Sequence, residues 1–149
     1  MSLQQDVMAA MKTAMKEKDQ LALAALRAVK SEILLAQTQT GTKEELTSEE
    51  EIKILSKLVK QRKDSAAIFA EQNRADLAEP ELAQAEVISQ FLPEQLSEDE
   101  ITNVVKEVIA KVGAEGMKDM GKVMGVVTQQ LAGKADGKTI STIVRQQLA

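Results

Sequence analysis

Two short runs of glycine and lysine near the C-terminal end contain the residues whose types and spacing best suit contact with a ligand. The first run is KDMGKVMG, residues 118–125, and the second is GKADGK, residues 133–138. Glycine lets a backbone come close to a ligand, and a lysine ammonium pairs with phosphate oxygens. On a short helix end or turn, such residues form a surface that can approach a phosphate backbone closely. Neither run contains a catalytic side chain. The two runs therefore indicate binding rather than catalysis.

Within the first run, Gly121 and Gly125 are four residues apart and share one face of a predicted helix. Each glycine costs a helix about 1 kcal/mol relative to alanine, so a compensating gain is expected. One interpretation is tight packing against a neighbouring helix. The other is a flat face for an RNA backbone, with Lys118 and Lys122 beside it. The sequence leaves both interpretations open.

The second run predicts a turn between the last two helices, with Asp136 as the N-cap residue and Gly137 beside it. The run lacks the GxxxxGK[ST] spacing and follows no predicted strand, which argues against a nucleotide-binding P-loop. We expect its lysines, Lys134 and Lys138, to remain exposed cations.

Most of the common catalytic and metal-binding side chains are absent from the 149 residues. The chain has no His, Cys, Trp or Tyr, so it lacks the commonest general base, the commonest metal ligand and a thiol nucleophile. The acidic triplet Glu98, Asp99 and Glu100 is interpreted as first-turn helix charge rather than a metal site. No pair stands out among the 23 acidic residues as a general acid and base. We therefore expect no catalytic residue, no metal and no cofactor.

The net charge of −4 argues against non-specific attraction to nucleic acid, but the charge is unevenly distributed. Residues 1–96 carry twelve basic and sixteen acidic side chains, whereas residues 101–149 carry seven basic and four acidic ones. With Phe69 and Phe91 as the two aromatic residues, stacking on single-stranded bases is not expected. Any RNA that the chain binds should be a folded one, read by shape and backbone.

Apolar residues recur at intervals of three and four along almost the whole chain, which predicts an all-α protein. Two helices are predicted before a break around Gly41, and a capping box at residues 47–50 begins the longest helix. The next helix is predicted over residues 76–92, with Leu82, Ala85 and Ile88 facing inward and Pro80 in the first turn or at a kink.

The longest predicted helix also carries a stripe of cations. We interpret Lys53, Lys57, Lys60 and Lys63 as a solvated face, and the alternative is an RNA contact by the run Lys57, Lys60, Arg62 and Lys63. We expect Arg62 to pair with a carboxylate such as that of Glu86 across the bundle.

Pro93 and a second predicted capping box at residues 97–100 indicate a junction at residues 93–97. We expect an N-terminal multi-helix subdomain, residues 1–95, and a C-terminal three-helix subdomain, residues 96–149. The three last helices are each too short to be stable alone, so their apolar stripes should be buried against each other. The seven methionines are expected to fill the cores, with Met117, Met120 and Met124 on the apolar stripe of the last subdomain.

The N-terminal residues lack the basic stretch and apolar core of a signal peptide, and no apolar run reaches the roughly 18 residues of a membrane span. We therefore expect a cytoplasmic location and no membrane partner.

Several motifs that follow one another along the chain resemble one family. They are KQRKDS at residues 60–65, NRADL at 73–77, FLPEQLS at 91–97 and the two glycine and lysine runs. Together they resemble the YqeY family, the free-standing relatives of the tail domain of the GatB subunit, over essentially the whole chain. The resemblance implies an all-helical protein linked to the amidotransferases that convert misacylated Glu-tRNA or Asp-tRNA into Gln-tRNA or Asn-tRNA. In those enzymes the GatB tail grips tRNA, and the carbon–nitrogen ligase chemistry lies elsewhere.

By this resemblance the candidate partner is tRNA, with lysines contacting phosphates and glycines providing clearance. The matching positions are Lys118, Gly121, Lys122, Gly125, Lys134, Gly137 and Lys138. The alternative is a helical protein–protein adaptor without an RNA ligand. In either case we expect a binding module that does not act as an enzyme on its own.

Overall fold

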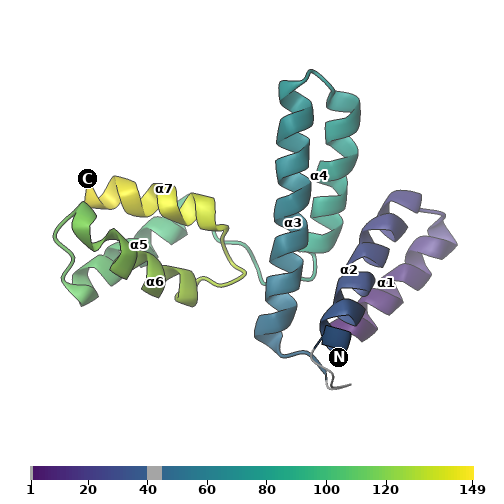
Figure 1. Ribbon diagram of the computed structural model, residues 1–149, viewed down its shortest axis with the longest axis horizontal. Coiled ribbons are helices and arrows are strands. Elements are labelled where there is room, and N and C mark those ends of the chain that lie inside the picture. Colours follow the sequence, from purple (N-terminus) through teal and green to yellow (C-terminus); the bar gives the residue numbers. More distant parts are fainter. Residues whose placement is uncertain (1, 40–44) are drawn as a thin grey trace. The chain divides into compact units, whose positions relative to one another are not determined.

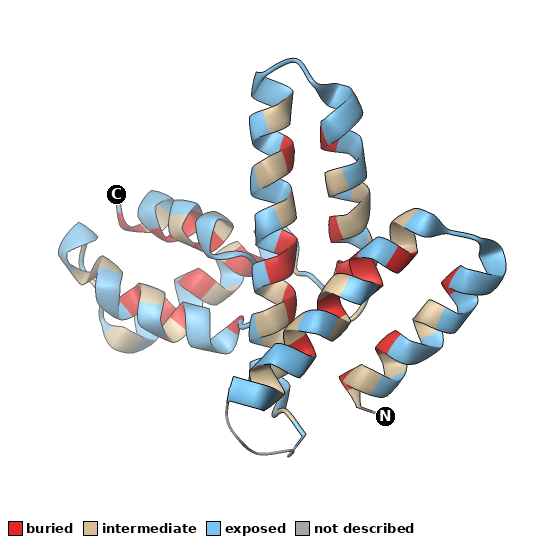
Figure 2. Ribbon diagram, turned by 45° about the vertical axis from the view of Figure 1, so that its right-hand side comes forward, coloured by how far each residue is buried: buried red, intermediate tan, exposed pale blue. Residues whose placement is uncertain are grey.

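The computed structural model describes residues 2–39 and 45–149, and within these ranges it contains helices and connecting turns but no strand (Figure 1). The prediction of an all-α protein is therefore confirmed, while the predicted break around Gly41 lies outside the described residues. The chain divides into two compact units, Met1–Leu92 and Pro93–Ala149, and each has its own hydrophobic core. Buried positions of each helix face the inside of their own unit (Figure 2).

Two helical hairpins form the first unit. Its helices are α1 (Leu3–Glu17), α2 (Gln20–Gln39), α3 (Ser48–Glu71) and α4 (Ala75–Ser89). A residue in the left-handed backbone conformation lies in the turn of each hairpin: Lys18 between α1 and α2, and Asn73 between α3 and α4. The hairpins meet through α2, which packs against α4 and, along a shorter stretch, against α3. The core where they meet is made of leucine, valine, isoleucine and alanine.

Side-chain caps determine where several helices begin. Thr47 Oγ1 accepts the N–H of Glu50 at 3.2 Å, and the Glu50 carboxylate accepts the N–H of Thr47 at 2.8 Å. This is the predicted capping box at the start of α3. At the start of α5 (Glu98–Val112) only half of the predicted box forms. Ser97 Oγ accepts the N–H of Glu100 at 3.2 Å, but the Glu100 carboxylate does not return the bond.

The structure corrects the prediction for α4 at two points. The helix ends at Ser89 rather than at residue 92. Of the two alternatives for Pro80, the first turn is excluded, because Pro80 is the sixth residue of the helix. Leu82, predicted to face inward, is 51% exposed, whereas Ala85 and Ile88 are buried. At about 100° per residue, Leu82 lies roughly 120° around the helix from Ile88, so it falls outside the arc that α4 buries.

The second unit contains α5, a 3₁₀ turn η1 (Met117–Asp119), α6 (Met120–Gln130) and α7 (Gly137–Leu148). Its core joins one apolar stripe from each α-helix, including Val105, Val123, Val127 and Val144, all of them fully buried. α5 ends at Gly113, whose backbone adopts the left-handed conformation that glycine tolerates best. Each stripe thus covers the other two, as predicted for helices of this length.

The segment between the two cores is held by the second unit. The N–H of Leu96 donates to the carbonyl of Lys134 at 2.9 Å, and the Gln95 side-chain amide donates to the carbonyl of Gly133 at 2.6 Å. Both bonds reach the loop between α6 and α7. They tie the start of the second unit to the loop that precedes its last helix.

The prediction that methionines fill the cores is confirmed only in part, because Met11, Met120 and Met124 pack, partly buried, against the two cores. Met8, Met15 and Met117 are about half exposed, and none of the other described methionines is fully buried. The cores are built instead from Leu, Val, Ile and Ala. Compact branched side chains fill the narrow space between closely packed short helices, and the flexible methionines lie at its edges.

We expect residues 93–149 to fold without the first unit, because their core and their linker bonds are internal to them. Expressed alone, this segment should give a helical circular dichroism spectrum and a cooperative thermal transition. Ser97→Ala should lower its free energy of unfolding by about 1 kcal/mol, since the amide of Glu100 loses its cap. A segment that stays unfolded in buffer would contradict this independence.

Candidate nucleic-acid interface

The first group of candidate residues lies on η1 and the first two turns of α6. Lys118, Gly121, Lys122 and Gly125 are all exposed. Val123 and Val127 on the same helix are completely buried, and their burial determines how α6 is turned about its axis. Gly121 and Gly125 each precede one of these valines by two residues, which places the glycines about 200° away, on the outer face.

Apart from the adjacent residues and the backbone of α6 itself, no atom lies within 4 Å of the position that a side-chain Cβ would take at Gly121 or Gly125. The interpretation of these glycines as helix-packing residues is therefore wrong, because nothing in the unit approaches them. Thr128, also exposed, continues the same face with a small side chain. The outer face of α6 is thus nearly bare backbone over two turns.

Lys122 also has a role within the fold. Its ammonium donates to the carbonyl of Val112 at 3.3 Å, one of the carbonyls left unpaired where α5 ends. An ammonium has three donors, so this contact leaves donors for a ligand. Lys118 lies in the 3₁₀ turn η1, directly before α6, and makes no ion pair with any residue that the structure describes.

The second group surrounds the N-terminus of α7. Asp136 is the N-cap, as predicted: its carboxylate accepts the N–H of Thr139 at 2.7 Å and the Thr139 hydroxyl at 2.9 Å. This carboxylate occupies the helix end that would otherwise attract an anion. Lys134 and Lys138 are exposed, as expected, and no atom crowds the Cβ position of Gly137. Any phosphate contact here would therefore come from the lysine side chains.

The structure places the candidate residues in two groups rather than in one patch. Lys118 precedes α6 and Lys122 lies in its first turn, so about 12 Å of helix, from Lys122 to Gln130, separates them from the loop that carries Lys134 and from Lys138 on α7. The arrangement is a bare backbone face along α6 with cations at both ends of the helix. Chemically it offers point charges and close access, and no group for bond making or breaking.

The cation stripe of α3 is solvated, as expected, with Lys53, Lys57, Lys60 and Lys63 exposed. Lys60 donates to Asp64 at 2.7 Å, and this hydrogen bond, together with the charge of Asp64, raises the pKa of Lys60 above its usual value. Within the described ranges, no group of three or more acidic side chains is arranged to hold a metal ion.

The predicted ion pair of Arg62 is wrong. Its guanidinium donates to the side-chain oxygen of Gln84 at 3.1 Å and to the carbonyl of Leu58 at 3.2 Å. The antiparallel register of α3 and α4 brings residue 84, rather than Glu86, opposite residue 62. Arg62 is half-buried, and its uncharged partners keep it in place beside the hairpin core.

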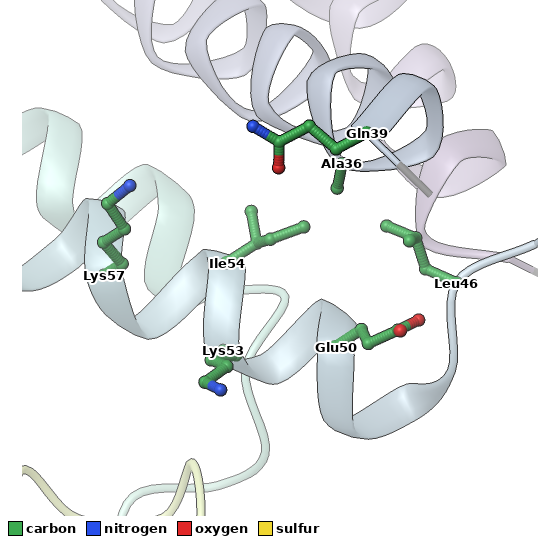
Figure 3. Close-up of a pocket in the computed structure, with 7 residues that line it drawn as sticks. All are labelled: Ala36, Gln39, Leu46, Glu50, Lys53, Ile54 and Lys57. Carbon is green, nitrogen blue, oxygen red and sulfur yellow. The ribbon is translucent and has the colours of Figure 1, made fainter. Parts of the chain in front are cut away.

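One feature of the first unit has no signal in the sequence. A groove of about 510 Å³ lies between the end of α2 and the start of α3 (Figure 3). It forms because α2 and α3 touch along only a short stretch, whereas each packs more extensively on α4. Periodicity within one helix cannot reveal a gap between two helices.

Because Gly125 meets open space, Gly125→Ala should raise the free energy of unfolding of the second unit by about 1 kcal/mol. Gly125→Leu should likewise leave the unit folded. If a neighbouring helix packed over Gly125, this substitution would instead lower the free energy of unfolding by a few kcal/mol. Thermal and urea unfolding of residues 93–149 would measure both. Val123→Ala, a cavity in the core of the same helix, should cost about 2 kcal/mol as the control. A destabilised Gly125→Ala protein would show that something packs over the glycine after all.

None of the helices in the described ranges is long and apolar enough to cross a membrane. The expectation of a cytoplasmic location stays a prediction, since some relatives of this chain are named as mitochondrial proteins.

Comparison with known proteins finds relatives of two kinds. Over 73 residues the chain is 37% identical to a subunit of the Glutamyl-tRNA(Gln) amidotransferase of Thermococcus gammatolerans, and the match covers 46% of this chain and 12% of that protein. Over 140 residues it is 30% identical to the Altered inheritance of mitochondria protein 41 of Pyrenophora tritici-repentis, covering 91% of this chain and 75% of that protein. The corresponding protein of Meyerozyma guilliermondii is 32% identical over 120 residues, 78% of this chain and 62% of that protein.

This chain therefore spans only a small part of the amidotransferase protein but most of the mitochondrial one. The family model described as Yqey-like protein matches residues 4–148. This match runs through both units and both glycine and lysine runs, and it shows that the chain belongs to the YqeY family.

Proposed function

We propose that this chain is a tRNA-binding accessory module, related to the glutamine-dependent tRNA amidotransferases, and that its second unit makes the contact. The observation that carries the proposal is the outer face of α6, where Gly121 and Gly125 lie open beside Lys118 and Lys122. The relatives support tRNA as the ligand, because they include part of an amidotransferase named for Glutamyl-tRNA(Gln).

The glycines support a backbone ligand because the fold gives no reason for them. Alanine would be more stable at both positions by up to about 1 kcal/mol and would meet no atom. A side chain would, however, hold an incoming phosphate backbone away from the helix. Glycine removes that obstacle, so the stability that the unit forgoes is recovered when a ligand binds.

The available side chains favour recognition by shape and charge over reading of bases. Lysines act as point charges toward phosphate, and phosphate contacts position a nucleic acid without selecting its sequence. Phe69 and Phe91, the two aromatic residues of the chain, both belong to the first unit. With cations at both ends of α6, the interface fits a folded RNA whose phosphate backbone runs along the helix, over about 16 Å.

The proposed role is binding and not acyl transfer. The matched segment is 12% of the length of the amidotransferase relative, so most of the sequence of that protein has no counterpart in this chain. The α6 face of this chain offers cations and backbone, without a nucleophile or a general base. Carbon–nitrogen ligase activity would require an amidotransferase as partner.

Replacing all four lysines (Lys118, Lys122, Lys134 and Lys138) with glutamate should abolish tRNA binding without unfolding the chain. The parent protein should bind unfractionated tRNA at low salt, with a log–log salt slope of roughly −3 to −4 from about four phosphate contacts. At physiological salt the dissociation constant should be on the order of micromolar. Fluorescence anisotropy with labelled tRNA over a salt series measures both quantities, and circular dichroism checks the fold.

A matched control separates local contact from overall charge. Lys118→Glu/Lys122→Glu and Lys106→Glu/Lys111→Glu change the charge of the same unit equally, but Lys106 and Lys111 lie on the exposed side of α5. The first pair should weaken tRNA binding at least tenfold, and the second should do much less. Equal effects of the two pairs, or a parent protein that does not bind tRNA at low salt, would leave the adaptor as the better account.

A further inference from the structure

The groove between α2 and α3 combines an apolar floor with a cationic rim. Ala36 on α2, Leu46 before α3 and Ile54 on α3 point toward one another across it (Figure 3). Leu46 and Ile54 are partly buried against the core of the first unit. The groove is therefore an outward continuation of the core of the first unit.

The side chains that line the groove include two lysines and one glutamate, so their net charge is positive. Lys53 and Lys57 line it from α3, are exposed, and form no ion pair with any residue in the described ranges. Glu50 also lines the groove, but its carboxylate already accepts the N–H of Thr47 in the capping box. One turn further along the stripe, Lys60 is paired with Asp64. Lys57 thus stands at the rim of the groove, whereas Lys53 lies on the flank of α3 with its side chain pointing away from the apolar floor (Figure 3).

The described residues of the first unit leave this floor open. The five residues between Gln39 and Glu45 are threonine, glycine, threonine, lysine and glutamate, and none has a large apolar side chain. A ligand that fits the groove must therefore bring apolar side chains for the floor and anions for the rim. A polyphosphate satisfies only the second need, because phosphate gains nothing from apolar surface.

We propose that this groove docks an acidic amphipathic helix of a protein partner. The lining residues of α3 run from Glu50 to Lys57, about 10 Å of helix, which corresponds to two turns of a docked helix. Apolar side chains at i and i+3 or i+4 fill the floor, as in other complexes in which a helix lies in a groove. Carboxylates beside them pair with Lys53 and Lys57. This site lies in the first unit, apart from the proposed tRNA face, and does not depend on it.

The test uses a synthetic helical peptide of two to three turns, with leucines one turn apart and glutamates flanking them, and a second peptide with lysine at each glutamate. The parent chain should bind the acidic peptide and not the basic one, with backbone NMR shifts at α2 and α3. Lys53→Glu/Lys57→Glu should weaken the acidic peptide at least tenfold and create binding of the basic peptide. Ala36→Trp, which fills the floor, should weaken the acidic peptide without changing the charge.

Lys12→Glu/Lys16→Glu is the matched control, because these lysines have the same spacing on α1 and are equally exposed. It should leave peptide binding within about twofold of the parent. Binding that survives both the charge reversal at Lys53 and Lys57 and the filling of the groove would overturn the proposal. So would shifts at Lys53 and Lys57 on adding tRNA with no response to the acidic peptide. Self-association of the chain that the same charge reversal abolishes would assign the groove to a second copy instead.

Discussion

The burial of valine on α6 is the constraint on which the proposed interface depends. α6 has 11 residues and two glycines, so it is held in place by tertiary packing rather than by its own propensity. Val123 and Val127 are completely buried against α5 and α7, and each contributes roughly 1.5–3 kcal/mol by burial. That exceeds the cost of about 1 kcal/mol at each glycine. Because the valines determine the rotation of the helix, they also turn Gly121 and Gly125 outward.

The second unit shows how a small domain can expose backbone and remain folded. Its linker is fastened to the loop before α7 by Leu96 and Gln95, and Lys122 caps the end of α5. These contacts secure the ends of α5 and α7 around a helix whose outer face makes no internal contact. The lysines that would meet a phosphate backbone are thus carried by turns and helix ends that the fold already holds.

The two units differ in the kind of surface that they leave uncovered. The outer face of α6 combines cations with bare backbone, which suits a phosphate chain. The groove of the first unit combines cations with an apolar floor, which suits an amphipathic protein helix. The proposed tRNA contact and the proposed protein contact therefore use separate units.

Features that arise from interactions between neighbouring residues could be predicted from the sequence alone. The all-α class follows from periodicity, the caps at Thr47, Ser97 and Asp136 from bonds that span three residues, and the end of α5 at Gly113 from its backbone. The two runs of glycine and lysine were likewise visible, together with the family that they resemble. All of these depend on neighbours in the chain.

The tertiary structure decided the features that depend on which helices meet. The partner of Arg62 depends on the register of α3 and α4, and the exposure of Leu82 depends on which arc of α4 is buried. The open environment of Gly125 depends on where α5 and α7 pack, and the groove on the short contact of α2 with α3. A helical pattern specifies which residues share a face, but not what covers that face, because the covering atoms come from distant parts of the chain.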